Sequence, residues 1–191
     1  MDLYVLLISI LSFVWFSFEI GLMVRDAAQG KGKTTNDKGT RYFNFIALFA
    51  GFAIAGPLNG TARFFFPGGR TPTVFFIGIA IMLAGIALRV WAIAVLGNSF
   101  RTTIETDTSQ KVISSGPYRL IRHPSYSGLL LICCGYGVAL QNWLSLLAVI
   151  LIPLAALLYR IRIEEKVLAV SLGSDYVDYQ KRTKKLIPWV W

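Results

Sequence analysis

The sequence is poor in the residues from which proteins build metal clusters and disulfide frameworks. It has a single histidine, His123, and two cysteines, Cys133 and Cys134, which are adjacent within an apolar run. Metal centres need several His, Cys or carboxylate ligands at suitable spacings, and a disulfide framework needs cysteines spread along the chain. We therefore expect neither a bound metal nor a disulfide-stabilised fold.

Charged residues are also scarce. Asp, Glu, Lys and Arg make up 15% of the 191 residues, against about 25% in a soluble domain, whereas hydrophobic residues make up 55%. This apolar excess excludes a disordered chain and argues against a soluble globular domain. A nucleic-acid-binding protein would explain the net charge of +9 but not the apolar excess, so no nucleic-acid partner is expected. Together the two features predict an integral membrane protein with a basic face.

Motifs of soluble nucleotide-binding and hydrolytic domains are missing too. There is no P-loop, no Gly-x-Ser-x-Gly elbow and no Gly-x-Gly-x-x-Gly after a strand. The sequence Gly135-Tyr136-Gly137 lies inside an apolar run and is not such a motif. A soluble-type nucleotide-binding domain is therefore excluded.

What the chain does have is a series of apolar stretches close to the length that crosses a bilayer. Five are expected, at Leu3–Val24, Phe43 to about Leu58, Val74–Leu96, 127–140 and 143–160. The last two form one block that Gln141-Asn142 interrupts, and this predicts a tight helical hairpin. Because helices and closed barrels satisfy their backbone in lipid, the fold class expected is all-α, a single membrane-embedded helical bundle over residues 1–191.

The Lys and Arg residues between these stretches predict the orientation in the membrane. Residues 25–41 carry five, residues 97–126 carry four and residues 160–191 carry seven, whereas residues 58–73 carry two. Since basic loops stay on the cytoplasmic side, five spans place the N-terminus outside and the C-terminus in the cytoplasm. An even number of spans would break this alternation.

Two charges lie inside the expected spans. Glu19 is about five residues from the cytoplasmic end of the first span, and Arg89 is about seven from the same end of the third. With a rise of about 1.5 Å per residue, their depths in the membrane agree. Because charges at such depths usually pair or line a cavity, we expect an ion pair between Glu19 and Arg89. Glycines in the second and third spans would allow close helix packing within or between chains, so the oligomeric state stays open.

The residues suited to chemistry gather in the cytoplasmic half. The segment from Gly116 to Gly128 holds the one histidine, two arginines and a proline at the expected start of the fourth helix. A helix start offers free N–H groups for a carboxylate or phosphate, and Ser125 or Ser127 is expected to cap it. The alternative is a basic turn at the membrane interface, anchored by tyrosines.

Two further patterns follow the fifth span. Arg160 and Glu164 share one helix face, and Arg162 and Glu165 share another; the alternative is a helix with ordinary salt bridges. In the tail, Gly173 predicts a helix stop, and a basic aromatic segment follows it. That segment could equally be a surface that lies on anionic lipid.

Taken together, these residues resemble the isoprenylcysteine carboxyl methyltransferase family, related to phospholipid N-methyltransferases. The resemblance covers roughly residues 97–191. It is carried by Arg122-His123-Pro124-Ser125-Tyr126-x-Gly128, by Arg160-x-x-x-Glu164-Glu165, and by Tyr176-x-x-Tyr179-x-x-Arg182-Thr183 ending in Ile187-Pro188.

The resemblance implies a helical membrane protein whose cytoplasmic half binds S-adenosyl-L-methionine. Residues 1–96 would hold three spans, and 97–191 would be the catalytic half, with the hairpin 127–160 and a cytoplasmic tail. The cofactor-binding residues implied are Lys111, Val112, Ile113, Tyr118, His123, Pro124, Ser125 and Tyr126, and the catalytic residues implied are Arg160 and Glu164.

The chemistry of the residues is compatible with this. A carboxylate acceptor is ionised at neutral pH, so methyl transfer to it needs positioning, which an arginine fork supplies. The expected substrate is an amphiphilic prenylcysteine-like molecule that enters from the bilayer. Two alternatives remain: a phospholipid or amine N-methyltransferase, in which Glu164 or His123 would act as a base, and a non-enzymatic membrane scaffold or lipid-binding protein.

Overall fold

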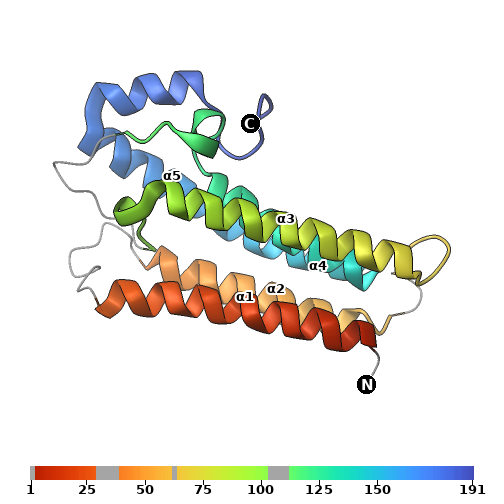
Figure 1. Ribbon diagram of the computed structural model, residues 1–191. Coiled ribbons are helices and arrows are strands. Elements are labelled where there is room, and N and C mark those ends of the chain that lie inside the picture. Colours follow the sequence, from red (N-terminus) through yellow and green to blue (C-terminus); the bar gives the residue numbers. More distant parts are fainter. Residues whose placement is uncertain (1–2, 29–38, 62–63, 103–111) are drawn as a thin grey trace.

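The computed structural model describes residues 3–28, 39–61, 64–102 and 112–191, and these are almost entirely helical (Figure 1). The helices are α1 (Leu3–Ala28), α2 (Thr40–Leu58), α3 (Pro72–Leu96), α4 (Pro124–Leu140) and α5 (Trp143–Arg182), with two short 3-10 helices, η2 (Gly97–Ser99) and η3 (Gly116–Arg119). The expected all-α fold is confirmed.

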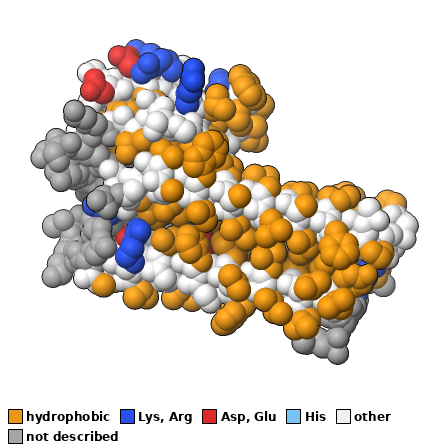
Figure 2. All heavy atoms as spheres, in the orientation of Figure 1, with side chains coloured by type: hydrophobic (Ala, Val, Ile, Leu, Met, Phe, Trp, Pro, Cys, Tyr) orange, Lys and Arg blue, Asp and Glu red, His pale blue; other side chains and the backbone are white. Residues whose placement is uncertain are grey.

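Four of the five expected spans are long and apolar enough to cross a membrane: α1, α2, α3 and α5. The fourth, α4, has 17 residues, and at about 1.5 Å per residue it reaches about 25 Å, the lower limit for the bilayer core. The chain is therefore an integral membrane protein. Hydrophobic side chains cover much of the long outer surface of the bundle (Figure 2), and Phe13, for example, is 74% exposed.

Helices α3 and α4 lie unusually close together, because glycines face each other across the contact. A Cβ atom added to Gly85 of α3 would lie 2.7 Å from the backbone nitrogen of Ile132 and 2.8 Å from the backbone oxygen of Gly128, both in α4. Gly78 and Gly135 make a similar close approach nearer the N-terminus of α3 and the C-terminus of α4. Only a residue without a side chain allows backbones to meet at this distance, so the glycines of α3 pack within the chain.

The predicted hairpin between α4 and α5 is confirmed at Gln141-Asn142. Gln141 adopts the left-handed conformation (φ 56°) that ends a helix. The Asn142 side chain accepts hydrogen bonds from the backbone N–H groups of Leu144 (3.0 Å) and Ser145 (3.2 Å), and so caps α5. Gln141 also bonds the main chain of Thr71 in both directions, which ties the hairpin to the start of α3.

Helix α1 is held by large side chains rather than by backbone proximity. Trp15 packs on Phe52 of α2 with ring centroids 5.3 Å apart, and Tyr4 packs on Phe75 of α3 at 4.8 Å. Trp15 and Phe52 belong to the main core, whose centre is formed by Met82 of α3 and Ile132 of α4, both completely buried. The core therefore joins all the layers of the bundle.

Helix α5 consists of two helical parts that meet at Gly173. The first part, residues 143–172, is about 45 Å long, about half as long again as a bilayer core is thick. Its first half packs in the bundle, and its second half extends beyond the apolar run. The predicted break at Gly173 is confirmed by its non-helical backbone (φ 59°). After it, residues 174–191, here called the C-terminal arm, turn back over the end of the bundle (Figure 1).

Candidate active site

A large cavity opens at the end of the bundle that the C-terminal arm covers. It holds about 1450 Å³ of empty space, part of it open to solvent. Its walls come from α1, α2, the C-terminal part of α3, η3, the start of α4, α5 and the arm. Residues from both halves of the chain therefore line one hollow.

Arg160 of α5 lies in the cavity wall and is 5% exposed. Its Nε donates to the Tyr126 hydroxyl (2.7 Å), and that hydroxyl donates to Glu164 Oε2 (2.6 Å). The predicted pair on one face of α5 is thus joined through a tyrosine from the start of α4. A hydroxyl that accepts from a cation and donates to a carboxylate holds both side chains in fixed positions.

The Arg160 guanidinium has further bonds on its other edges. NH1 donates to Thr40 Oγ1 of α2 (3.2 Å), and NH2 donates to the backbone oxygen of Thr102 (2.7 Å). Thr40 is 1% exposed. Neither residue was singled out in the sequence, because nothing in their local pattern marks them as partners of a residue more than fifty positions away.

Glu165 lies at the centre of a second cluster, just beside the cavity. Its Oε1 is 2.8 Å from Arg122 Nε and 3.3 Å from His123 Nε2, and its Oε2 is 3.6 Å from Lys185 Nζ. Burial raises the pKa of Glu165, but the hydrogen bonds from His123 and Arg122 outweigh it and lower the pKa to about 2. Glu165 is therefore a fixed anion that joins α5, the start of α4 and the arm.

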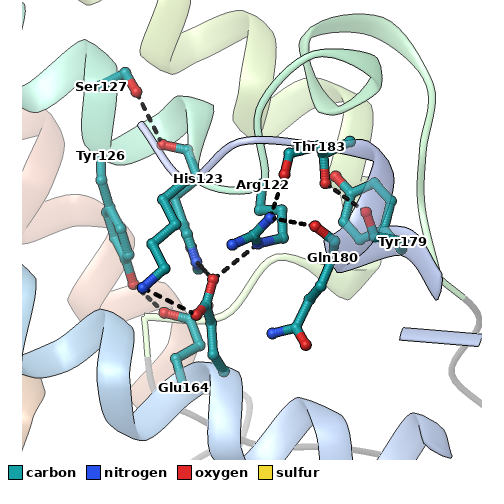
Figure 3. A network of polar contacts seen from close by, with 10 residues as sticks. Arg122, His123, Tyr126, Ser127, Glu164, Tyr179, Gln180 and Thr183 are labelled. Carbon is teal, nitrogen blue, oxygen red and sulfur yellow. Dashed lines mark hydrogen bonds and ion pairs between the residues drawn. The ribbon is translucent and has the colours of Figure 1, made fainter. Parts of the chain in front are cut away.

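The arm is bound to the start of α4 mainly by its backbone. The backbone N–H groups of Arg122 and His123 donate to the carbonyls of Lys184 (2.7 Å) and Lys185 (3.0 Å). The Arg122 side chain donates to the carbonyls of Gln180 and Thr183, and Figure 3 shows these residues converging beside His123 and Glu164. The arm thus forms a fixed wall of the site.

Two buried tyrosines close the same wall. The Tyr179 hydroxyl donates to the backbone oxygen of Tyr118 (2.7 Å). Burial raises the pKa of Tyr179 to about 12 and raises the pKa of Tyr118 further. Both phenols are therefore protonated at neutral pH and are not bases.

The expected ion pair within the membrane is confirmed. Arg89 Nε and NH2 both donate to the Glu19 carboxylate, NH2 at 2.6 Å to Oε2. Arg89 NH1 also donates to Ser125 Oγ (2.6 Å) and to the Ser125 carbonyl (3.2 Å). The pair therefore connects α1 and α3 to the first turn of α4 and borders the cavity.

Most of the side chains expected at the site meet around this one cavity. Its lining includes Val112, Ile113, Tyr118, His123, Ser125, Tyr126, Arg160 and Glu164. Pro124 is buried at the first position of α4, and Lys111 lies outside the described residues. The expected serine cap of α4 is wrong: His123 holds the cap position and makes no capping bond to the helix with its side chain. Ser125 instead bonds Arg89, and Ser127 donates to the Leu186 carbonyl (2.6 Å).

Several cavity residues were not expected from the sequence. Tyr176 belongs to the tail motif, and the sequence alone assigns it no role in the site. In the structure it lines the cavity, and its buried hydroxyl has no hydrogen-bond partner among the described residues. Arg41, Asn44 and Phe45 enter the lining from the start of α2. The pairing of Glu165 with Arg122 rather than with its helix neighbour Arg162 was also missed, since helix spacing shows only local neighbours.

Comparison with known proteins decides the family. Residues 77–170, which include α4 and the Arg160–Glu165 segment, match the model of the isoprenylcysteine carboxyl methyltransferase family. The chain belongs to this family. The resemblance found in the sequence motifs is thereby confirmed.

Curated relatives occur in plants and fungi. The chain is 33% identical over 129 residues to protein-S-isoprenylcysteine O-methyltransferase B of Arabidopsis thaliana, an alignment that covers 66% of each protein. It is 33% identical to a probable protein-S-isoprenylcysteine O-methyltransferase of Oryza sativa subsp. indica, covering 61% of this chain and 62% of the relative. The enzyme of Saccharomyces cerevisiae is 29% identical, and 48% of it is covered. The chain thus spans less than two thirds of these relatives.

A solved structure shows the same fold. It is the eukaryotic intramembrane Ras methyltransferase ICMT, with a TM-score of 0.54 and 25% identity. The likeness covers 79% of this chain and 51% of that protein. The family fold thus extends well beyond the matched residues 77–170, into the part of the chain that precedes them.

Proposed function

We propose that the protein is an S-adenosyl-L-methionine-dependent carboxyl O-methyltransferase that acts on an isoprenylcysteine-type lipidated substrate. The observation that supports this most is Arg160, a guanidinium held by Tyr126, Thr40 and Thr102 in the wall of the cavity. A planar fork of this kind is suited to hold one carboxylate in one orientation. The names of the family and its relatives supply the substrate class.

The task of the protein in this reaction is positioning. A carboxylate acceptor, with a pKa near 4, is ionised at neutral pH and needs no base. Arg160 would orient the acceptor carboxylate, and Glu164 would keep the Tyr126–Arg160 unit in place through its bond to the Tyr126 hydroxyl. Bringing the reacting atoms into line in this way lowers the entropic cost of reaction.

The residues that line the cavity support S-adenosyl-L-methionine as the methyl donor. S-adenosyl-L-methionine supplies an electrophilic methyl group on a cationic sulfonium, which aromatic faces favour. Tyr126 and His123 stack with ring centroids 5.4 Å apart and planes within 8°. The Tyr176 hydroxyl, which has no hydrogen-bond partner within the described part of the chain, offers a donor. Val112, Ile113, Tyr118, His123, Pro124, Ser125 and Tyr126 would hold the cofactor, with Lys111 from the segment before them.

The arrangement of the cavity supports two routes of approach. Apolar residues from the bundle, including Phe45, Leu48 and Leu129, line the part within the helices, where a prenyl chain from the bilayer would lie. The arm and η3 form the polar end, where the cofactor would enter from the cytoplasm. Orientation with the N-terminus outside and the C-terminus cytoplasmic follows from the basic loops. The arm would also exclude water from the transfer.

Replacing Arg160 tests this proposal. Arg160→Ala should lose most turnover of an S-prenylated N-acylcysteine, because the acceptor carboxylate loses its fork. Affinity for S-adenosyl-L-methionine should stay within a few-fold, since Arg160 belongs to the acceptor side. Turnover is measured with a labelled methyl donor, and affinity by calorimetric titration of the detergent-solubilised protein.

A matched control is Lys181→Ala, an exposed lysine on the arm whose Nζ pairs with Asp178 of its own helix. It should leave both quantities unchanged. Full turnover in Arg160→Ala would refute the assignment of Arg160. No binding of S-adenosyl-L-methionine to the unaltered protein would refute the enzyme itself and favour a lipid-binding scaffold.

A further inference from the structure

We propose that Asp26, at the end of α1, is a positioning residue for methyl transfer that holds Arg160 in place through the main chain of Thr102. This inference rests on the proposed role of Arg160. It gives the first helix, which lies outside the family-matched residues 77–170, a specific part in the reaction.

The contacts form a continuous chain. Asp26 is 0% exposed, and its Oδ2 accepts a hydrogen bond from the backbone N–H of Thr102 at 2.6 Å. The carbonyl of the same residue accepts from Arg160 NH2 at 2.7 Å. The other carboxylate oxygen, Oδ1, is bound by Arg25 at 3.0 Å. The backbone N–H of Thr102 is thus bonded to Asp26, and its carbonyl is bonded to Arg160.

Thr102 needs such a support because it lies in irregular backbone. It follows η2 and is part of no helix, so no regular hydrogen-bond ladder sets its position. A hydrogen bond to an ionised carboxylate is roughly twice as strong as a neutral one. Since Asp26 is mounted on a 26-residue helix, it provides a rigid point from which the Thr102 carbonyl is aimed at Arg160.

Three residues bond the Arg160 guanidinium from three sides, and Thr102 is one of them. Tyr126 of α4 bonds Arg160 Nε, Thr40 of α2 bonds NH1, and the Thr102 carbonyl bonds NH2. A planar guanidinium bonded at three nitrogens cannot rotate without losing a bond. Without Asp26, the Thr102 carbonyl would shift and the Arg160 guanidinium would shift with it. A misplacement of a positioning group by about 1 Å costs roughly 10²-fold in rate.

The experiment compares Asp26→Ala with Asp26→Asn. Asp26→Ala should lower kcat for the S-prenylated N-acylcysteine by roughly 10²-fold, with affinity for S-adenosyl-L-methionine within a few-fold. Asp26→Asn keeps an acceptor oxygen for Thr102 N–H and should recover much of the rate. Ser12→Ala on the same helix is the control, because the Ser12 hydroxyl donates to Ile8 O of its own helix at 2.7 Å; it should be fully active.

A double substitution gives the readout that a purely structural role would not produce. In an Arg160→Lys background with reduced turnover, Asp26→Ala should lower kcat little further, because its effect passes through the guanidinium. Additive losses, or equal losses in Asp26→Ala and Asp26→Asn with a lower melting temperature, would overturn the proposal. Full activity of Asp26→Ala beside an inactive Arg160→Ala would overturn it and leave the proposed function intact.

Discussion

At the scale of single residues, the protein places charges where lipid would make them costly and satisfies each with a partner. Glu19 and Arg89 are 7% and 6% exposed, and Arg89 also bonds Ser125 of α4. A charge inside a bilayer is tolerated when it is paired. The pair therefore fixes the relative depth of α1 and α3 as well as the first turn of α4.

This pairing predicts a specific pattern of stabilities. Glu19→Leu should destabilise the protein by about 3–5 kcal/mol, because it leaves Arg89 buried without a carboxylate. The double variant Glu19→Leu/Arg89→Leu should be less destabilised, since a pair replaced by apolar side chains is often close to neutral. The stabilities of the single and the double variant are compared by their midpoints of thermal unfolding in the same detergent.

The matched control for that comparison is Asp178→Ala, which removes an exposed ion pair with Lys181 on the arm. It should change the midpoint little, because exposed pairs are screened by water. If the double variant loses as much as the two single variants added together, the two side chains do not act as a pair.

At the scale of elements, backbone contact between α3 and α4 builds the frame of the site. The close approach at Gly85 and Gly128 places the start of α4 beside the end of α3. Tyr126 is thereby brought to the wall of the cavity, where it meets Arg160. The short α4 needs this contact, because its 17 residues barely reach across the bilayer core.

Gly85→Ala should therefore destabilise the protein, by about 1–3 kcal/mol as expected for overpacking. Its Cβ would lie within 3 Å of two backbone atoms of α4, which cannot move aside as a side chain can. Gly21→Ala in α1 is the control: a Cβ there meets nothing within 4 Å, and alanine favours helix. Equal melting temperatures for the two variants would contradict the close packing.

At the scale of the whole molecule, one carboxylate supports the attachment of the arm to the bundle, in addition to the backbone hydrogen bonds between them. Glu165 bonds Arg122 and His123 at the start of α4 and lies near Lys185 of the arm. It stands beyond the apolar half of α5, at the polar end of the molecule. The charge of Glu165 therefore contributes to holding the arm against the start of α4.

This dependence predicts loosening of the arm in acid. The pKa of Glu165 is lowered from 4.5 to about 2 in the folded protein, so its contribution is complete above about pH 4.5 and is lost as the pH falls toward 2. Hydrogen exchange of residues 174–191, corrected for intrinsic rates, should rise over this range.

In Glu165→Gln the arm should exchange faster already at pH 7 and should lose this pH dependence. Asp178→Asn, on the exposed side of the arm, should behave like the unaltered protein. Arm exchange that keeps the same pH dependence in Glu165→Gln would show that another group controls the arm.

Much of this architecture was predictable from local sequence. Apolar run lengths predicted the spans, Gln141-Asn142 predicted the hairpin, and the matched depths of Glu19 and Arg89 predicted their pairing, because each depends on spacing along one or two helices. The cap of α4 was not predictable. Serine is a preferred residue at the N-cap of a helix, but here Ser125 bonds Arg89 and Ser127 bonds the Leu186 carbonyl, and both partners come from distant parts of the chain.

The sequence by itself thus determined the membrane class, the helices and the residue types suited to the chemistry, since these follow from composition and periodicity. Only the tertiary structure decided which side chains meet. Thr40 and Thr102 bond Arg160, and Asp26 bonds Thr102. Glu165 pairs with Arg122 instead of Arg162. The physical reason is that helix periodicity shows which face a residue occupies, whereas its partner on that face depends on how separate helices pack.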